Sequence, residues 1–191
     1  MKPRTIIEYA VIAVAALVLC LTVEAFLIKP YRIPSPSMVD TLRPGDMVLV
    51  DRVAYHLHNP GRGDIVVFDS VGAGKENPAN PRFQTLIKRI IGLPGETISL
   101  KDGHVLINGV VLDEPYVHKG ADGVADPTNP FSTGTPWSLE KPYTLGPGEY
   151  FMMGDNRTES EDSRGWGPMY SREIVGKAFF VYWPITRIGT L

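Results

Sequence analysis

The sequence predicts a mainly β protein preceded by one N-terminal apolar helix. After Pro30, short apolar runs alternate with turn signals, and no run outside the N-terminus has a helical period. The 17 prolines and 19 glycines are spread along the chain, which favours turns over long helices. We therefore expect the part of the chain after the apolar run to form more than one twisted sheet.

The composition is that of an ordinary globular protein of 191 residues, with 43% hydrophobic and 21% charged residues. A formal net charge of -2 gives no reason to expect nucleic acid as a partner. Cys20 is the single cysteine, which excludes an intramolecular disulfide and a cysteine metal cluster. It lies in the apolar run, where a catalytic thiol is not expected. We predict no metal site and no cofactor.

The N-terminal apolar run is predicted to be an uncleaved transmembrane anchor over residues 5–28. Residues 9–23 carry no charge and are bounded by Glu8 and Glu24. A spanning helix needs roughly 20 residues, so this run has almost the required length, and its two glutamates would lie at the interfaces.

The flanking residues suggest the orientation of this anchor. Lys2 and Arg4 precede it, which favours a cytoplasmic N-terminus of residues 1–4 and places the remainder on the outer face. The alternative is a cleaved secretory signal. Glu24 and the apolar residues 26–28 interrupt the small-residue pattern of a cleavage site and argue against it.

The strands are predicted from short apolar runs between turn residues. They are expected over residues 47–55, 64–68, 85–91, 97–100, 104–107, 110–112, 149–153 and 173–183. Asp102-Gly103 and Asn108-Gly109 are typical hairpin turns. Residues 117–141 contain glycines and prolines without periodicity and are predicted to form a long irregular loop.

Lys88 lies in the middle of the predicted strand 85–91 (TLIKRII). Side-chain alternation gives two faces that both carry apolar residues: Leu86, Lys88 and Ile90 against Ile87, Arg89 and Ile91. A lysine buried there is costly unless it is neutral or paired. Desolvation lowers a lysine pKa, and a neutral amine is a usable base. The alternative is a lysine without a catalytic role, whose amine reaches solvent or pairs with an acid.

Two further segments are rich in hydroxyl and charged groups. Residues 33–38 (IPSPSM) carry two serines between prolines, which fix the backbone and make the segment rigid. Taken alone, such a segment is most often a linker. Residues 154–167 follow an apolar strand and are dense in Asp, Asn, Arg, Ser and Gly. They suit either a solvated loop or a hydrogen-bonded scaffold behind an active site.

Three segments, in this order after the apolar run, resemble the type I signal peptidase family. The first is IPSPSM followed by TLRPGD, the second is RGDIVVF and then IKRIIGLPGE, and the third is GDNR-x-x-S-x-DSR-x-WG. The resemblance implies a β-rich catalytic core of residues 29–98 and 148–191. A smaller β domain, residues 99–147, would be inserted into this core.

The resemblance also implies a role for individual residues. Ser37 matches the nucleophile, Lys88 the general base, and Ser35 a hydroxyl that joins the Ser37 backbone N–H in the oxyanion hole. Ser160 matches a serine that orients the lysine amine. The charged residues that brace the site match Asp162, Arg164 and Arg89. The positions that match the lining of the substrate pocket are Ile33, Pro34, Met38, Leu42, Leu86 and Ile87.

The sequence departs from the family pattern at three places. Pro36 replaces a usual glycine, Thr158-Glu159 replaces Asp-Asn, and Asp40 replaces a proline. Asp40 adds a carboxylate near the nucleophile. If it lies close to Lys88, we expect it to keep the amine protonated and to raise the pH needed for activity.

The implied function is that of a membrane-bound serine endopeptidase using a Ser-Lys dyad and an acyl-enzyme. It would remove signal peptides from exported preproteins after A-x-A-like sites. The expected location is the bacterial cytoplasmic membrane, single-pass, with the catalytic domain on the outer face. The expected partners are preproteins and the lipid bilayer, and no nucleic acid is expected to bind. The protein is expected to be a monomer that can contact the secretion translocon.

Three alternatives are open. A histidine base is disfavoured because none of His56, His58, His104 and His118 clusters in the sequence with a serine and an acid. A LexA-like self-cleaving Ser-Lys protease is disfavoured by the apolar anchor and the lack of a DNA-binding module. A membrane-tethered β binding module would tolerate Ser37→Ala with its partner affinity intact.

Overall fold

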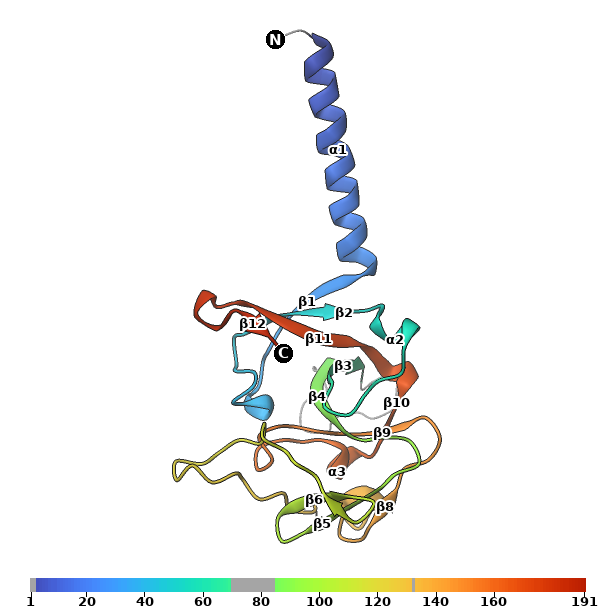
Figure 1. Ribbon diagram of the computed structural model, residues 1–191, viewed down its shortest axis with the longest axis vertical. Helices are drawn as coiled ribbons and strands as arrows, with labels where there is room; N and C mark the ends of the chain where they lie inside the picture. The colour runs from blue at the N-terminus through green and yellow to red at the C-terminus, as the bar shows by residue number, and fades with distance from the viewer. Residues whose placement is uncertain (1–2, 70–84, 132) are drawn as a thin grey trace.

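A computed structural model describes residues 3–69, 85–131 and 133–191. One helix, α1 (Pro3–Phe26), stands away from a body built of two β-sheets (Figure 1). The chain passes from α1 into β1 (Ile28–Arg32), an edge strand of the larger sheet. An edge position tolerates Pro30, which has no N–H to donate to a neighbour.

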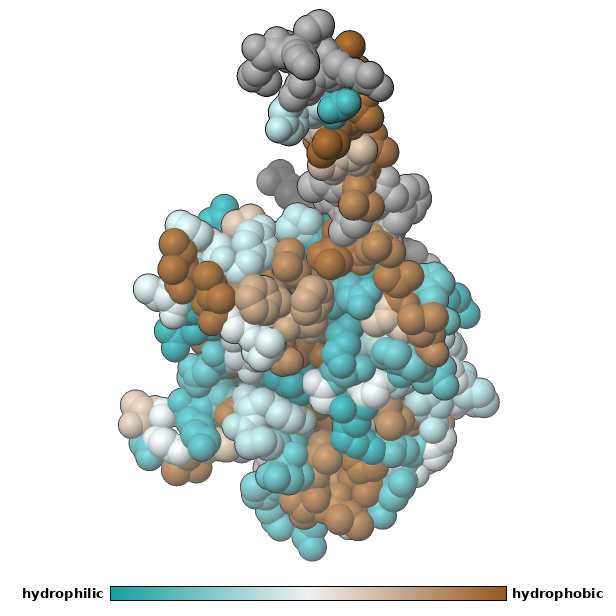
Figure 2. Space-filling view, turned by 45° about the horizontal axis from the view of Figure 1, so that its top comes forward, coloured by the Kyte–Doolittle hydropathy of each residue, from teal (hydrophilic) through white to brown (hydrophobic). Residues whose placement is uncertain are grey.

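The described apolar side chains of α1 are exposed, as Figure 2 shows for much of its length. Between Ile7 and Leu19, the exposed large hydrophobic residues have exposed fractions of 57% to 65%. Among the described residues, no helix has both the length and the apolar character needed to cross a membrane. The predicted span of 5–28 also extended too far, because Ile28 already pairs with Asp51 in the sheet. Lys2 lies outside the described residues.

The larger sheet has eight strands in the order β1-β2-β11-β3-β4-β9-β10, with β12 paired to β11. Every pairing in it is antiparallel. The strands after β1 are β2 (Met47–Asp51), β3 (Ile65–Asp69), β4 (Thr85–Gly92), β9 (Glu149–Met153), β10 (Met169–Tyr170), β11 (Ile174–Trp183) and β12 (Gly189–Thr190).

The smaller sheet has four strands in the order β7-β6-β5-β8. Its strands are β5 (Thr97–Lys101), β6 (His104–Ile107), β7 (Val110–Val111) and β8 (Tyr143–Thr144). Both predicted hairpin turns have positive φ at their two residues: 51° and 80° at Asp102 and Gly103, 52° and 82° at Asn108 and Gly109. Such angles favour Asn, Asp and Gly. The division into a core and an inserted domain of 99–147 stays a prediction.

Short helical turns connect the strands. They are η1 (Pro36–Met38), α2 (Ala54–Leu57), η2 (Pro136–Ser138), α3 (Ser163–Trp166), η3 (Ser171–Glu173) and η4 (Ile185–Arg187). The predicted strand 47–55 was therefore too long, because β2 ends at Asp51. The Asp51 carboxylate accepts hydrogen bonds from the Val53 and Ala54 N–H groups and so turns the chain into α2. The two-residue strands β8, β10 and β12 gave no periodic signal.

Strand β4 lies where the apolar core clusters meet. Ile87 belongs to the cluster formed with β2 and β11, Ile91 to the cluster beneath the smaller sheet, and Ile90 to a third with Phe68 and Tyr150. This confirms that both faces of the strand are buried. A charged side chain on β4 therefore leaves water when the protein folds, and Lys88 and Arg89 do so side by side.

Candidate active site

The predicted nucleophile and base meet in the structure, although they belong to different elements. Ser37 lies in η1, and Lys88 lies on β4. Lys88 Nζ donates a hydrogen bond of 2.7 Å to Ser37 Oγ and another of 3.1 Å to the Ile87 carbonyl. Both residues are buried, with exposed fractions of 5% for Ser37 and 3% for Lys88. A hydroxyl held against a neutral amine in this way can give up its proton to it.

The burial of Lys88 decides the state of its amine. Loss of hydration lowers the pKa of Lys88 from 10.5 to about 8, against the charges of Asp162, Asp155 and Glu161, which raise it. At pH 7 a base with such a pKa is neutral in roughly a tenth of the molecules, compared with fewer than about one in a thousand for an ordinary lysine. The environment therefore makes the amine a usable base near neutral pH.

The second serine of the IPSPSM segment lies beside the first. Ser35 Oγ is 3.3 Å from Ser37 Oγ. Asn156 holds the same segment from behind: its N–H donates to the Ser37 carbonyl at 3.1 Å, and its side-chain amide donates to the Pro36 carbonyl at 3.4 Å. The two hydroxyls thus sit on a backbone that is fixed by both proline rings and the loop after β9.

Gly154 allows this close approach, and sequence reasoning did not single it out. A Cβ atom added to Gly154 would lie 2.3 Å from Ser160 Oγ and 2.4 Å from the Ser37 carbonyl oxygen. Real Cβ atoms do not come so near, so any side chain would push the nucleophile segment away. The signal was available: a glycine stands between a buried strand and the polar cluster.

Arg89 braces the site from the face of β4 opposite Lys88. Its guanidinium donates to both carboxylate oxygens of Asp155, at 2.9 Å and 2.7 Å, and stacks 4.1 Å over the ring of Tyr116. Thr41 Oγ1 donates to the same carboxylate at 2.6 Å. Asp155 therefore ties the chain after Ser37 to β4, which carries Lys88. The sequence placed Asp155 in the polar segment 154–167 and Thr41 in the TLRPGD motif, but it gave neither residue a role of its own, because their contacts join distant parts of the chain.

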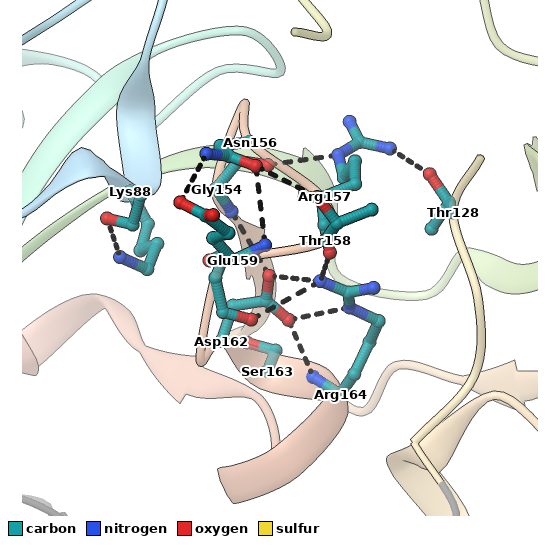
Figure 3. A network of polar contacts seen from close by, with 12 residues as sticks. Lys88, Thr128, Gly154, Asn156, Arg157, Thr158, Glu159, Asp162, Ser163 and Arg164 are labelled. Atoms are coloured by element: carbon teal, nitrogen blue, oxygen red, sulfur yellow. Dashed lines mark hydrogen bonds and ion pairs between the residues drawn. The ribbon is translucent and has the colours of Figure 1, made fainter. Parts of the chain in front are cut away.

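A second paired group lies behind the loop after β9 (Figure 3). Asp162 accepts 2.8 Å hydrogen bonds from Arg164 Nε and Nη2, and another from the Gly154 N–H at 3.2 Å. Burial by itself raises the pKa of Asp162, but the charge and hydrogen bonds of Arg164 outweigh it and the pKa is lowered. Arg157 pairs with Glu114 at 2.5 Å. These buried ions hold one another in the charged state.

Ser160 lies next to this group but makes no hydrogen bond to the lysine amine. Its hydroxyl is buried and has no hydrogen-bond partner among the described residues. Lys88 instead donates to Ser37 and to the Ile87 carbonyl. The role of Ser160 in orienting Lys88 stays a prediction.

A groove opens beside the two serines. Its volume is about 40 Å³, which suits a small side chain. Met38 and Leu42 do not line it, because both are fully buried in the core. The groove is lined by Tyr31, Arg32, Ile33, Pro34, Ser35, Ser37, Val67, Thr85, Leu86, Ile87 and Lys88.

Asp40 contacts a histidine and not the lysine. Its carboxylate is 56% exposed and lies 2.9 Å from His118 Nδ1. The carboxylates that most raise the pKa of Lys88 are Asp162, Asp155 and Glu161. Asp40 is not among the main causes of the Lys88 pKa, contrary to the expectation from the sequence. The histidine does have an acid partner, which the sequence did not indicate.

No histidine donates to or accepts from Ser37 Oγ in the described part of the chain; its partners are Lys88 Nζ and Ser35 Oγ. Within residues 3–69, 85–131 and 133–191, no three His, Cys, Asp or Glu side chains are grouped closely enough to hold a metal ion.

Comparison with known proteins identifies the family. A sequence model of the family described as "Signal peptidase, peptidase S26" matches residues 6–183. This chain belongs to that family. A signal peptidase I of Leptolyngbya laminosa is 37% identical over 177 residues, which cover 92% of this chain and 79% of the relative. A signal peptidase I of Bacillus licheniformis is 34% identical over 192 residues, covering 98% of this chain and 94% of the relative.

Among solved structures, a signal peptidase I of Enterococcus faecalis V583 has 37% sequence identity and a TM-score of 0.46. The match covers 62% of this chain and 95% of that one. Membership of the S26 peptidase family makes this protein a serine peptidase, that is, a hydrolase.

Proposed function

We propose that the protein is a type I signal peptidase that cleaves signal peptides from exported preproteins, with Ser37 as nucleophile and Lys88 as general base. One observation carries the proposal: the buried Lys88 Nζ donates a 2.7 Å hydrogen bond to Ser37 Oγ. The lowered pKa of Lys88, about 8 because of its burial, supports the same roles.

The first half of the reaction forms an acyl-enzyme. The neutral amine of Lys88 takes the proton of Ser37 Oγ while the oxygen attacks the scissile carbonyl carbon. The Ser37 N–H and the Ser35 hydroxyl donate to the oxyanion that results. The ammonium of Lys88 then returns the proton to the leaving nitrogen, and the C–N bond breaks.

The second half returns the free enzyme. Lys88, neutral again, takes a proton from a water molecule, whose oxygen attacks the ester carbon of the acyl-enzyme. The C–O bond to Ser37 breaks, and the proton passes from Lys88 to Ser37 Oγ. One amine therefore serves both halves, which requires that it titrate near the working pH.

The groove supports a substrate with small side chains bound as a strand. β9 pairs with Arg89, Ile90 and Gly92 of β4, and its register stops before residues 85–88. A substrate in extended conformation can add to β4 at this edge, which no other strand of the described residues pairs with, and present its alternate side chains to the groove. We propose cleavage after A-x-A-like sites on this ground, because a groove of about 40 Å³ favours small side chains.

We also propose that α1 (Pro3–Phe26) anchors the protein in the bacterial cytoplasmic membrane, single-pass, with the catalytic domain on the outer face. The exposed apolar side chains of α1 support this, because water alone would not favour such a surface. A monomeric state and contact with the translocon are part of the same proposal.

The deciding experiment is cleavage of a purified preprotein in detergent. Wild type is expected to cut at the A-x-A site, with a rate that rises with pH through about 8, because only the neutral form of Lys88 acts as a base. Ser37→Ala and Lys88→Ala should be inactive though folded, and Ser171→Ala, at an exposed serine of η3, should match wild type. Activity retained by Lys88→Ala would exclude the proposed dyad.

A further inference from the structure

Asp40 and His118 form a contact that the proposed reaction does not use. The two lie 78 residues apart, and His118 Nδ1 is 2.9 Å from Asp40 Oδ2. An ionised carboxylate can only accept, so the imidazole proton is on Nδ1. We propose that Asp40 and His118 are positioning residues, which hold the nucleophile segment 36–41 against the loop 154–156; this rests on the proposed function of Ser37.

His118 touches both of the segments that meet at the nucleophile. Its side chain reaches Asp40, three residues after Ser37, and its backbone N–H donates to the Asp155 carbonyl at 2.9 Å. Asn156, the next residue, donates its N–H to the Ser37 carbonyl. One residue thus connects the chain that carries the nucleophile to the loop that fixes the nucleophile's carbonyl.

The position of His118 is itself fixed. Its carbonyl accepts the Asp126 N–H at 2.8 Å, and the Asp126 carboxylate accepts from Thr158 Oγ1 at 3.2 Å. Val117, directly before it, is buried with an exposed fraction of 6%. The histidine therefore acts from a backbone held at several points, and the contact is more than a pairing of two free surface side chains.

The size of the effect follows from exposure. The side chains of His118 and Asp40 are 29% and 56% exposed, so water screens part of their attraction. The segment is also held by Asp155, through the hydroxyl of Thr41. We therefore expect a loss of roughly 2- to 5-fold in kcat when the contact is removed, the range of a partly exposed polar pair.

The test compares Asp40→Asn, His118→Gln and the double variant in the full-length protein, by preprotein cleavage in detergent. Each single variant should lower kcat roughly 2- to 5-fold with little change in KM, and the double variant should lose no more than the worse single one. The exchanged pair Asp40→His with His118→Asp should recover activity, because the backbone contacts of residue 118 do not depend on its side chain. His104→Gln, at an exposed histidine of β6, is the control.

The pH profile separates positioning from charge. If the pair positions the nucleophile, the midpoint of the rise in kcat with pH stays that of wild type. A midpoint moved to lower pH in Asp40→Asn, with the plateau unchanged, would mean that Asp40 acts on the charge of Lys88 and would overturn positioning. Additive losses in the double variant would also overturn it.

Unfolded variants are recognised by thermal unfolding. If wild type cleaves the preprotein and both single variants are as active as wild type, the positioning role is overturned and the proposed function is not. A wild type that does not cleave, together with an inactive His104→Gln, overturns the proposed function and the positioning role with it.

Discussion

Lys88 and Arg157 are two buried cations beside the same loop, in opposite electrostatic surroundings. Arg157 donates to both oxygens of Glu114, at 3.1 Å and 2.5 Å, and to Thr128. Lys88 donates to a hydroxyl and a carbonyl, and no carboxylate lies within hydrogen-bonding distance of it in the described part of the chain. Burial lowers the pKa of Lys88 to about 8. For Arg157 burial also lowers the pKa, but Glu114 outweighs it and the pKa is raised.

A hydrogen-bonded carboxylate distinguishes the surroundings of Arg157 from those of Lys88. Burial penalises the charge of both, but a hydrogen-bonded carboxylate compensates Arg157 and keeps it charged. The carboxylates near Lys88 are farther away and offset only part of the burial penalty on its charge, so the neutral amine is accessible. Removing Arg157 should therefore cost stability, and removing Lys88 should cost activity.

The largest expected effect comes from changing each cation to methionine. Lys88→Met should lower the cleavage rate roughly 10³-fold or more, because the base is lost. Its free energy of unfolding should stay unchanged or rise, because a desolvated amine is replaced by an apolar chain. The free energy of unfolding of Arg157→Met should be about 3–5 kcal/mol lower than that of wild type, because Glu114 is left buried without its partner.

Urea unfolding and initial cleavage rates of both variants measure this difference. A Lys88→Met protein that unfolds as readily as Arg157→Met would remove the distinction between the two cations. Equal cleavage rates of the two variants, corrected for the folded fraction, would also contradict the distinction between Lys88 and Arg157.

Ser35→Ala tests the next largest effect. Its hydroxyl lies 3.3 Å from Ser37 Oγ, and loss of one oxyanion donor costs roughly 10²–10³ in rate. We expect that loss in kcat, with the thermal unfolding midpoint of wild type, since Ser35 is half-buried and belongs to none of the three apolar core clusters. Ser171→Ala is the matched control. A change in KM alone would assign Ser35 to substrate binding instead.

Asp162→Asn tests how a nearby carboxylate affects the pKa of Lys88. Burial dominates the lowered pKa of Lys88, and Asp162 is the carboxylate that opposes it most. Neutralising Asp162 lowers the pKa of Lys88 further, so the midpoint of the pH–rate profile should move to lower pH. Stability should fall by about 3 kcal/mol, because Arg164 loses its partner.

Glu161→Gln is the control for that variant. Glu161 is exposed and also raises the pKa of Lys88, but by less than Asp162 does. Its profile should shift less than that of Asp162→Asn, with unfolding unchanged. A shift toward higher pH in either variant would contradict the proposed electrostatics.

Thr41→Val tests the smallest effect. It removes the hydroxyl that donates to Asp155 at 2.6 Å and leaves the volume of the side chain nearly unchanged. One hydrogen bond of this kind contributes about 1 kcal/mol, so we expect about fivefold lower kcat. Thr144→Val, at an exposed threonine of β8, should match wild type in the same kinetic assay. A loss as large as that of Ser35→Ala would give Thr41 a more direct role.

The sequence was sufficient where the signal is local. Asp102-Gly103 and Asn108-Gly109 predict their hairpins because few residues adopt positive φ. The apolar neighbours of Lys88 predict that its strand is buried on both faces, since alternation is a property of consecutive residues. The order of three motifs along the chain indicated the family, which the comparisons confirm.

Tertiary structure alone decided which distant groups meet. The contacts of Arg89 with Asp155, Asp40 with His118 and Thr41 with Asp155 join residues 66, 78 and 114 positions apart. Such contacts depend on the strand order β3-β4-β9, which no local preference encodes. The same packing places Met38 and Leu42 in the core and leaves Gly154 no room for a side chain. The sequence predicts which residues carry the chemistry, because each motif is local, and the sheet order brings Ser37 and Lys88 together.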